Sequence, residues 1–219
     1  MRAALVIRGN KSFLNRKVKD SMVSNINKLK RSLLYSEELG IELKNNNDDE
    51  IFKWFLASIL FGARITETIA KNTYKTFKKY NLLEPQKILE AGWDFLVNPI
   101  MREGGYVRYD FKTSTKILKI CETLIKEYDG SLKKLHKNSK DKKDLQNRLL
   151  KFYGIGPVTV NIFLRELRPY WKKANPEPLL IVKRIARKLG IDLNKHNRKS
   201  LVFTRIEAGL IRLRKDVLR

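Results

Sequence analysis

A glycine-rich turn, Gly154-Ile155-Gly156, separates two apolar-periodic segments of this chain and is followed directly by proline. Two glycines leave the backbone amides of such a turn uncovered, and Pro157 is favoured in the first turn of a helix. The first amides of that helix have no partner within it and carry the positive end of the helix dipole. Together these groups predict a site that binds a phosphate without reading a base. A simple turn between two helices is the alternative for so short a motif.

The charge of the chain favours a polyanionic partner. There are 47 Lys and Arg residues against 23 Asp and Glu residues, so the formal net charge is +24 at pH 7. Charge that serves solubility or thermostability would raise the Glu content together with the Lys content, which is not the pattern here. No segment is apolar for the roughly 18 residues that a membrane span needs, and no secretory signal is recognised. We therefore expect an intracellular protein, cytoplasmic or nucleoid-associated, that binds nucleic acid and no membrane.

Helical periodicity dominates the sequence and predicts an all-α fold. Apolar residues recur at three- and four-residue steps from Val18 to Leu33, which predicts an amphipathic helix. Residues 51–61 are apolar on nearly every side, which predicts a helix buried in the centre of a bundle. Further helices are expected at 66–80, 114–128, 145–152, 157 onwards, 179–189 and 200–218, with short pieces at 85–89 and 93–96, a loop at 99–113, a lysine-rich connector at 132–144 and a linker at 168–178.

Cysteine and histidine usage indicates no metal site. Cys121 is the only cysteine, so it cannot alone hold zinc or an iron–sulfur cluster, and we expect it to be a buried apolar residue. His136 and His196 lie among lysines, which favours surface positions, and they show no metal-ligand spacing. We expect no cofactor.

The segment around the glycine turn resembles the helix-hairpin-helix of the endonuclease III-like DNA glycosylase superfamily. The resemblance rests on Leu149, Phe152, the two glycines, Thr159 and Asn161 in their order and spacing. Three further segments are similar to the family in the same order: 52–77 resembles its central helix and following loop, 116–130 the helix before the hairpin, and 182–191 a later helix. Ordered similarity over about residues 51 to 191 is more specific than any single motif.

The resemblance implies two helical lobes with double-stranded DNA between them. A central bundle at 46–169 would carry the hairpin, and a terminal lobe would be formed by 1–45 and 170–219. Members of the family kink the duplex and flip one damaged or mispaired nucleotide out of the stack. We accordingly expect a monomer that acts as a DNA glycosylase in base excision repair.

The same resemblance implies which residues contact DNA. The hairpin contacts are expected at Gly154, Ile155, Gly156, Val158 and Thr159. Arg64 aligns with the side chain that fills the gap left by the flipped nucleotide, and a phosphate contact or a plain surface charge is the alternative. Tyr106 falls near the family's intercalating loop and is expected either to wedge between bases or to belong to the core.

The two positions that carry the family's chemistry are changed in this chain. The lysine that forms a Schiff base in some members aligns with Val158, so we expect a monofunctional enzyme that uses water. The aspartate that stabilises the cationic sugar aligns with Leu179. Glu177 in the linker, or Asp110 after the glycine loop, is the candidate catalytic carboxylate. For each of them, a solvated acid paired with a lysine is the alternative.

Two other classes of function are compatible with these features. A non-catalytic binder of damaged, abasic or bent DNA would keep the hairpin and lose the chemistry. An RNA-associated basic protein has less support, because the sequence lacks the aromatic strings with which such modules stack bases.

Overall fold

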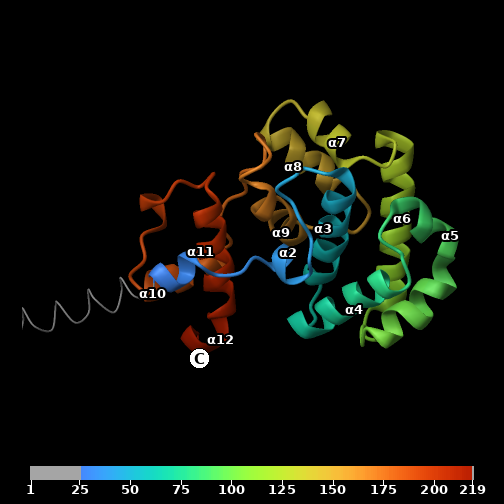
Figure 1. Cartoon of the computed structure of the whole chain (residues 1–219), viewed down its shortest axis with the longest axis horizontal. Coiled ribbons are helices and arrows are strands. Elements are labelled where there is room, and N and C mark those ends of the chain that lie inside the picture. Colours follow the sequence, from blue (N-terminus) through green and yellow to red (C-terminus); the bar gives the residue numbers. More distant parts are fainter. Residues whose placement is uncertain (1–25, 219) are drawn as a thin grey trace, which may run out of the picture. The chain divides into compact units, whose positions relative to one another are not determined.

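The computed structural model describes residues 26–218, and no β-strand occurs among them (Figure 1). The predicted all-α fold is confirmed. Within the same range, no helix is both long and apolar enough to cross a membrane. The described chain forms two compact units, which we call the hairpin unit (residues 35–177) and the terminal unit (residues 26–34 with 178–218). Their boundaries therefore lie after residues 34 and 177, not after residues 45 and 169, and residues 1–25 of the predicted terminal lobe are outside the described range.

Helices account for most of both units. The hairpin unit contains α2 (Tyr35–Glu38), α3 (Asp48–Phe61), α4 (Glu67–Lys79), α5 (Pro85–Phe95), the π-helix η1 (Leu96–Met101), α6 (Asp110–Tyr128), α7 (Leu132–Asn138), α8 (Lys142–Leu150) and α9 (Pro157–Leu167). The terminal unit contains α10 (Leu180–Lys188), the 3₁₀ turn η2 (Leu193–Lys195), α11 (Leu201–Arg212) and α12 (Arg214–Val217).

Helix α3 forms the core of the hairpin unit, as the sequence predicts. The side chain of Asn47 caps its first turn by accepting a hydrogen bond from the Asp49 amide at 2.8 Å. Nearly every residue of the helix from Ile51 to Leu60 is buried. The helix packs against α4 and α9 (Figure 1). The Trp54 indole donates a hydrogen bond to the Phe163 carbonyl of α9 at 3.0 Å. Helix α3 therefore supports both α9, which follows the glycine turn, and α4, which follows the loop that contains Arg64.

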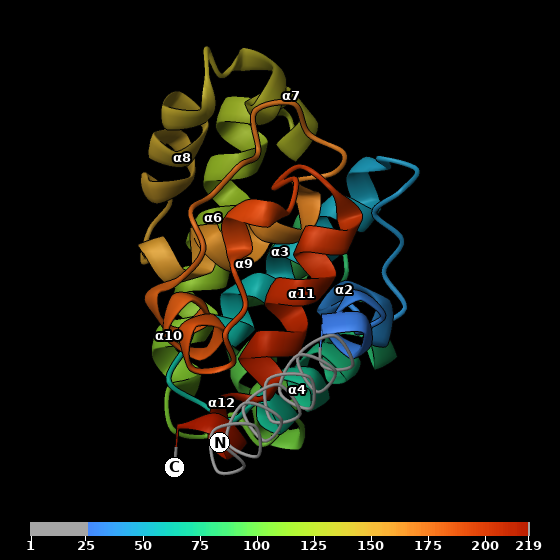
Figure 2. The ribbon, with the colours of Figure 1, turned by 90° about the vertical axis from the view of Figure 1, so that its left-hand side faces the viewer.

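Several elements differ from the sequence prediction. Helix α6 begins at Asp110, within the segment expected to be a loop, and residues 96–101 of that region form a π-helix. The two short pieces expected at 85–89 and 93–96 are helical, and they lie on either side of a break in α5 at Gly92, where φ is +74°; residue 96 already belongs to η1. The predicted lysine-rich connector contains α7, because Leu132 and Leu135 lie three residues apart on one buried face. Figure 2 shows α7 and α8 together at one end of the hairpin unit.

The terminal unit is built around a small apolar cluster. Its buried members are Leu29, Val182, Ile185, Ala186, Ile206 and Leu210. Gly209 permits the close approach of its two chain segments, since a Cβ there would lie 2.4 Å from the Ser32 hydroxyl oxygen. The amphipathic helix predicted from Val18 is described only from residue 26, and residues 26–30 are helical. The helix predicted at 200–218 is divided at Leu213 into α11 and α12.

The linker after α9 is attached to the hairpin unit by polar and aromatic contacts. The Trp171 indole donates to the Asn46 side chain at 2.9 Å, and its ring stacks on His136 with centroids 4.4 Å apart. The Lys173 ammonium donates to the carbonyls of His136, Lys137 and Ser139, which lie at the end of α7. His136 is partly exposed, in agreement with its predicted surface position, and one face of its ring stacks on Trp171.

A fully buried carboxylate joins α9 to the start of the hairpin unit. Glu166 accepts hydrogen bonds from the amides of Tyr35 at 3.1 Å and Ser36 at 2.9 Å, and the Arg165 guanidinium lies 3.7 Å from it. Burial raises the pKa of the Glu166 carboxyl, while Arg165 and the two amides favour its charged form. The chain is thereby fixed to α9 at the point where the hairpin unit begins.

We expect Glu166→Ala to lower the free energy of unfolding by about 3–5 kcal/mol, because it deprives two buried amides and a buried guanidinium of one acceptor. Urea denaturation measures this loss. The matched control, Glu122→Ala at an exposed position of α6, should change stability by less than about 0.5 kcal/mol. Equal effects of the two substitutions would contradict a structural role for the buried carboxylate.

Candidate nucleic-acid interface

The glycine turn forms an exposed corner between α8 and α9. Gly154 is exposed and has φ of +70°, a conformation that favours glycine. Ile155 points inward and is buried, and its amide donates to the Phe152 carbonyl at 3.1 Å. Phe152 is itself buried and packs its ring against Phe55 and Tyr128. The corner is therefore held from the core side, and its glycines face outward.

The first turn of α9 presents backbone amides at this corner. Gly156 is the N-cap residue, and no side chain caps the helix. The first amide bonded back into the turn is that of Val160, which donates to the Gly156 carbonyl at 3.1 Å. Val158 is 48% exposed, and apart from its neighbours in the chain no residue would lie within 4 Å of a Cβ at Gly156. The amides of Val158 and Thr159 thus have no acceptor within α9 and lie at the positive end of its dipole.

Two lysines of α6 add positive charge to the corner. A Cβ on Gly154 would lie 2.8 Å from Cε of Lys116, so the alkyl chain of that lysine lies against the turn. Burial lowers the pKa of the Lys116 ammonium. The Lys119 ammonium lies 4.2 Å from the ring centroid of Tyr153, which is exposed. This distribution of charge suits a phosphate more than a cation.

Arg64 lies on a loop that contacts the start of α9. The loop leaves α3 at Gly62, and a Cβ there would lie 2.1 Å from the Thr159 hydroxyl oxygen. Thr159 is buried by this contact, so it can offer a ligand its amide and not its hydroxyl. Arg64 is exposed two residues farther along. The structure therefore brings the predicted Arg64 next to the predicted hairpin residues.

Tyr106 belongs to the core. It is 1% exposed, and its hydroxyl accepts a hydrogen bond from the Thr113 hydroxyl at 3.2 Å. The preceding Gly104 fits closely against α4, since a Cβ there would lie 2.5 Å from Cα of Thr73. A wedge between bases would require this ring to leave its site, so the core alternative is correct and the wedge prediction was wrong.

The two candidate carboxylates lie on different elements of the hairpin unit. Asp110 opens α6 and accepts a hydrogen bond from the Phe111 amide at 2.9 Å. Glu177 is exposed, and its carboxylate lies 3.5 Å from the Lys142 ammonium. The Glu177 backbone is held to α9, because its carbonyl accepts a hydrogen bond from the Asn161 side chain at 2.6 Å. The linker is thereby fixed beside the helix that carries the free amides.

The two positions that align with the family's catalytic residues hold apolar side chains, Val158 and Leu179, at the starts of α9 and α10. Val158 lies in the exposed first turn of α9. Leu179 is the N-cap residue of α10 in the terminal unit, where no side chain caps the helix.

Cys121 is buried, as predicted, and burial raises the pKa of its thiol. Among residues 26–218, no group of three His, Cys, Asp or Glu side chains could hold a metal ion.

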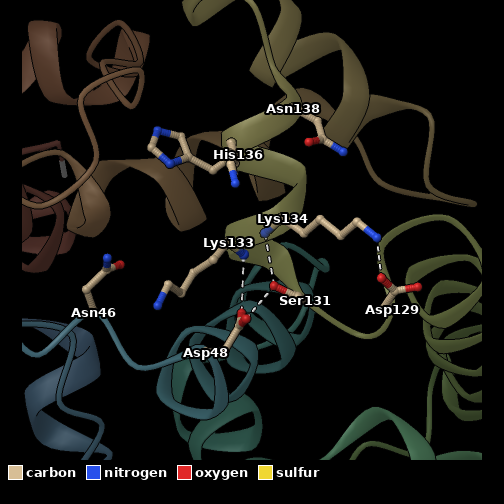
Figure 3. A pocket seen from close by; sticks show the side chains of 9 residues that line it. Asn46, Asp48, Asp129, Ser131, Lys133, Lys134, His136 and Asn138 are labelled. Carbon is tan, nitrogen blue, oxygen red and sulfur yellow. Dashed lines mark hydrogen bonds and ion pairs between the residues drawn. The ribbon is translucent and has the colours of Figure 1, made fainter.

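The hairpin unit contains a pocket at the start of α7 (Figure 3). The Asp48 carboxylate in it accepts hydrogen bonds from the Ser131 hydroxyl and from the Lys133 amide. The Lys134 ammonium pairs with Asp129. The acceptor at this helix start is therefore a side chain of the protein, which leaves the glycine corner as the better anion site. The lining residues are Asn46, Asp48, Asp129, Ser131, Lys133, Lys134, His136, Lys137 and Asn138.

Comparisons of this chain with protein-family models, with curated proteins and with solved structures found no match. The interpretation of the corner therefore depends on its geometry and on the residues that carry the sequence resemblance.

Two glycine substitutions test whether the corner binds a phosphate. Gly156→Ala places a methyl group in open space beside the free amides, so we expect it to weaken duplex binding about fivefold while costing less than about 1 kcal/mol of stability. Gly154→Ala should lower stability by about 1 kcal/mol, because its backbone has a positive φ and its Cβ would meet Lys116. Fluorescence anisotropy with a labelled duplex and urea denaturation measure the two effects.

Gln86→Ala, an exposed substitution on α5, is the control and should leave duplex affinity unchanged. Duplex affinity that is the same in Gly156→Ala as in the parent would show that the corner amides do not contact DNA.

Proposed function

We propose that this protein binds duplex DNA through its glycine corner and acts there as a monofunctional DNA glycosylase on a damaged or deaminated base. The observation that carries the proposal is the contact between Gly62 and Thr159, which holds exposed Arg64 beside the uncapped start of α9. Base flipping needs a firm hold on the strand and a side chain to occupy the vacated space. The corner offers the first, and Arg64 the second.

The binding step uses backbone amides and lysines. The amides of Val158 and Thr159 donate hydrogen bonds to a phosphate at the positive end of α9, and Lys116 and Lys119 neutralise the adjoining strand. Because these contacts read no base, they anchor any sequence. Selection then depends on how readily a nucleotide leaves the stack, which is easiest where a base is damaged or mispaired.

The chemical step would be hydrolysis of the glycosidic bond. Water attacks the anomeric carbon, the carbon–nitrogen bond breaks, and its electron pair leaves with the base. A carboxylate stabilises the positive charge that develops on the sugar and orients the water. The carboxylate takes the proton that the water loses, and the departing base gains one from solvent. Glu177 and Asp110 are the candidates for this role, because Val158 and Leu179 cannot perform it.

Arg64→Ala tests the gap-filling role. We expect this substitution to reduce the preference for a duplex with an abasic site over an intact duplex about fivefold, because the space left by the missing base is no longer occupied. Competition binding with the two duplexes measures the preference. Lys75→Ala, an exposed cation on the neighbouring α4, should leave the preference unchanged. If Arg64→Ala weakens binding to both duplexes equally, Arg64 is a phosphate contact.

Single-turnover incubation with a panel of lesion-bearing duplexes tests the glycosylase. We expect release of at least one damaged or deaminated base, and a rate about 100- to 1,000-fold lower in either Glu177→Gln or Asp110→Asn, since only one of them is the catalytic carboxylate. The other substitution serves as its control. If no lesion is released by the parent protein, glycosylase activity is excluded for that panel. If both substitutions leave the rate unchanged, the assigned carboxylates are wrong.

A non-catalytic binder of damaged, abasic or bent DNA is the second candidate. The apolar residues at positions 158 and 179 and the pairing of Glu177 with Lys142 favour it. This candidate predicts the same anchoring on the corner, with affinity that falls by orders of magnitude between roughly 50 and 200 mM salt and with no released base. The lesion panel separates the two candidates, and a comparison of duplex DNA with RNA separates both from an RNA-associated protein.

A further inference from the structure

Two large aromatic side chains lie exposed and in contact on the hairpin unit. Trp93 of α5 is 39% exposed and Phe111 of α6 is 58% exposed, and their ring centroids are 5.3 Å apart at an interplanar angle of 44°. We call this pair the aromatic shelf. The other two tryptophans, Trp54 and Trp171, are buried. An exposed cluster of two such rings is a typical feature of a binding surface.

Hydrogen bonds fix the orientation of the aromatic shelf. The Trp93 indole nitrogen donates to the Thr115 hydroxyl at 3.0 Å, and that hydroxyl donates to the Phe111 carbonyl at 2.9 Å. Trp93 directly follows Gly92, whose positive φ redirects α5. The indole is therefore held on α6 with part of its surface open to solvent, and little conformational entropy is lost when a flat ligand stacks on it.

A row of lysines leads from the aromatic shelf to the glycine corner. Lys112, Lys116 and Lys119 follow one another on α6, and the distance along the helix from Phe111 to Lys119 is about 12 Å. At the far end, the Lys119 ammonium lies over the exposed ring of Tyr153, next to the turn. Residues 111–121 include no acid. This segment of α6 therefore carries only positive charge between the shelf and the proposed phosphate site.

Two acids, Asp110 and Asp94, are the sequence neighbours of Phe111 and Trp93 in the aromatic shelf. The Asp110 carboxylate accepts a hydrogen bond from the Phe111 amide, so it is directed to the start of its own helix. Asp94 is exposed beside Trp93. An acidic or purely apolar protein partner would use the lysines or the rings alone, whereas a nucleic-acid strand uses both, because its phosphates are anionic and its bases are flat.

We propose that the aromatic shelf stacks on unpaired nucleobases of a DNA strand whose phosphates lie along the α6 lysines towards the glycine corner. This inference rests on the proposed DNA-binding function of the corner and specifies which kind of DNA binds there. The preferred substrate is DNA with unpaired bases beside the bound phosphate, such as a gap or a locally melted segment. Exposed aromatic rings of fixed orientation next to a row of cationic side chains are the features that bind single-stranded nucleic acid without sequence preference.

Tryptophan fluorescence tests the proposal, because Trp93 is the one exposed indole of the three in the chain. Titration with a 12-nucleotide oligothymidylate should quench the solvent-exposed part of the emission, and Trp93→Phe should remove that response. Phe111→Ala should lower the affinity for the oligonucleotide about five- to tenfold and leave the affinity for an intact duplex unchanged. Val202→Ala, on the exposed face of α11, is the control for removal of an apolar surface group.

Three results would overturn the proposal. They are the absence of quenching, an equal loss of oligonucleotide and duplex affinity in Phe111→Ala at unchanged thermal stability, and self-association in sedimentation experiments that Phe111→Ala abolishes without any effect of the oligonucleotide. Failure of the proposed function gives a different pattern. If the shelf binds the oligonucleotide while Gly156→Ala does not weaken duplex binding and no base is released, the corner assignment fails and the shelf assignment stands.

Discussion

The proposed DNA surface depends on one close contact, between the end of α3 at Gly62 and the start of α9 at Thr159. A side chain at position 62 would overlap the threonine hydroxyl, so only glycine lets the two helices approach this far. The same pair of helices is joined deeper in the core by the hydrogen bond from the Trp54 indole to the Phe163 carbonyl. Because the contact is made at the helix ends, it sets the position of the Arg64 loop and of the uncapped amides together. Neither feature alone would distinguish this surface from an ordinary helix terminus.

Buried polar groups hold α9 in the position that this contact requires. Glu166 connects its last turn to α2, and Asn161 connects its middle to the Glu177 carbonyl in the linker. The desolvation of such groups is costly, and it is offset only when each finds partners of good geometry, as the two amides at Glu166 illustrate. These bonds are directional, unlike apolar packing. They therefore fix the position of α9 relative to α2 and the linker.

The sequence predicted those parts of the fold that depend on local patterns. The apolar faces of α3 identified a buried helix, and the glycines and Pro157 identified an exposed turn with a helix after it. The sequence did not predict features that depend on distant partners. Tyr106 resembled an intercalating side chain because it follows two glycines, but Gly104 packs on Thr73 and carries the tyrosine into the core. The stacking of Trp171 on one face of the partly exposed His136 ring likewise depends on the return of the chain after α9. The π-helix before α6 was not predicted either, since it has no periodic signature. The break at Gly92, in contrast, falls between the two short pieces that the sequence pattern predicted.

The two halves of the proposed function place different demands on the sequence. Phosphate binding at the corner uses backbone amides, so it requires glycine and an uncapped helix start and tolerates many side chains around them. Hydrolysis requires particular ionisable groups at particular positions. Val158 shows the difference, because its side chain cannot react and its amide still points from the first turn of α9. Leu179 shows it too, since α10 begins there although no side chain caps it. The proposed phosphate binding therefore depends on neither side chain, and any catalytic carboxylate has to come from another element, such as the linker that Asn161 fixes beside α9.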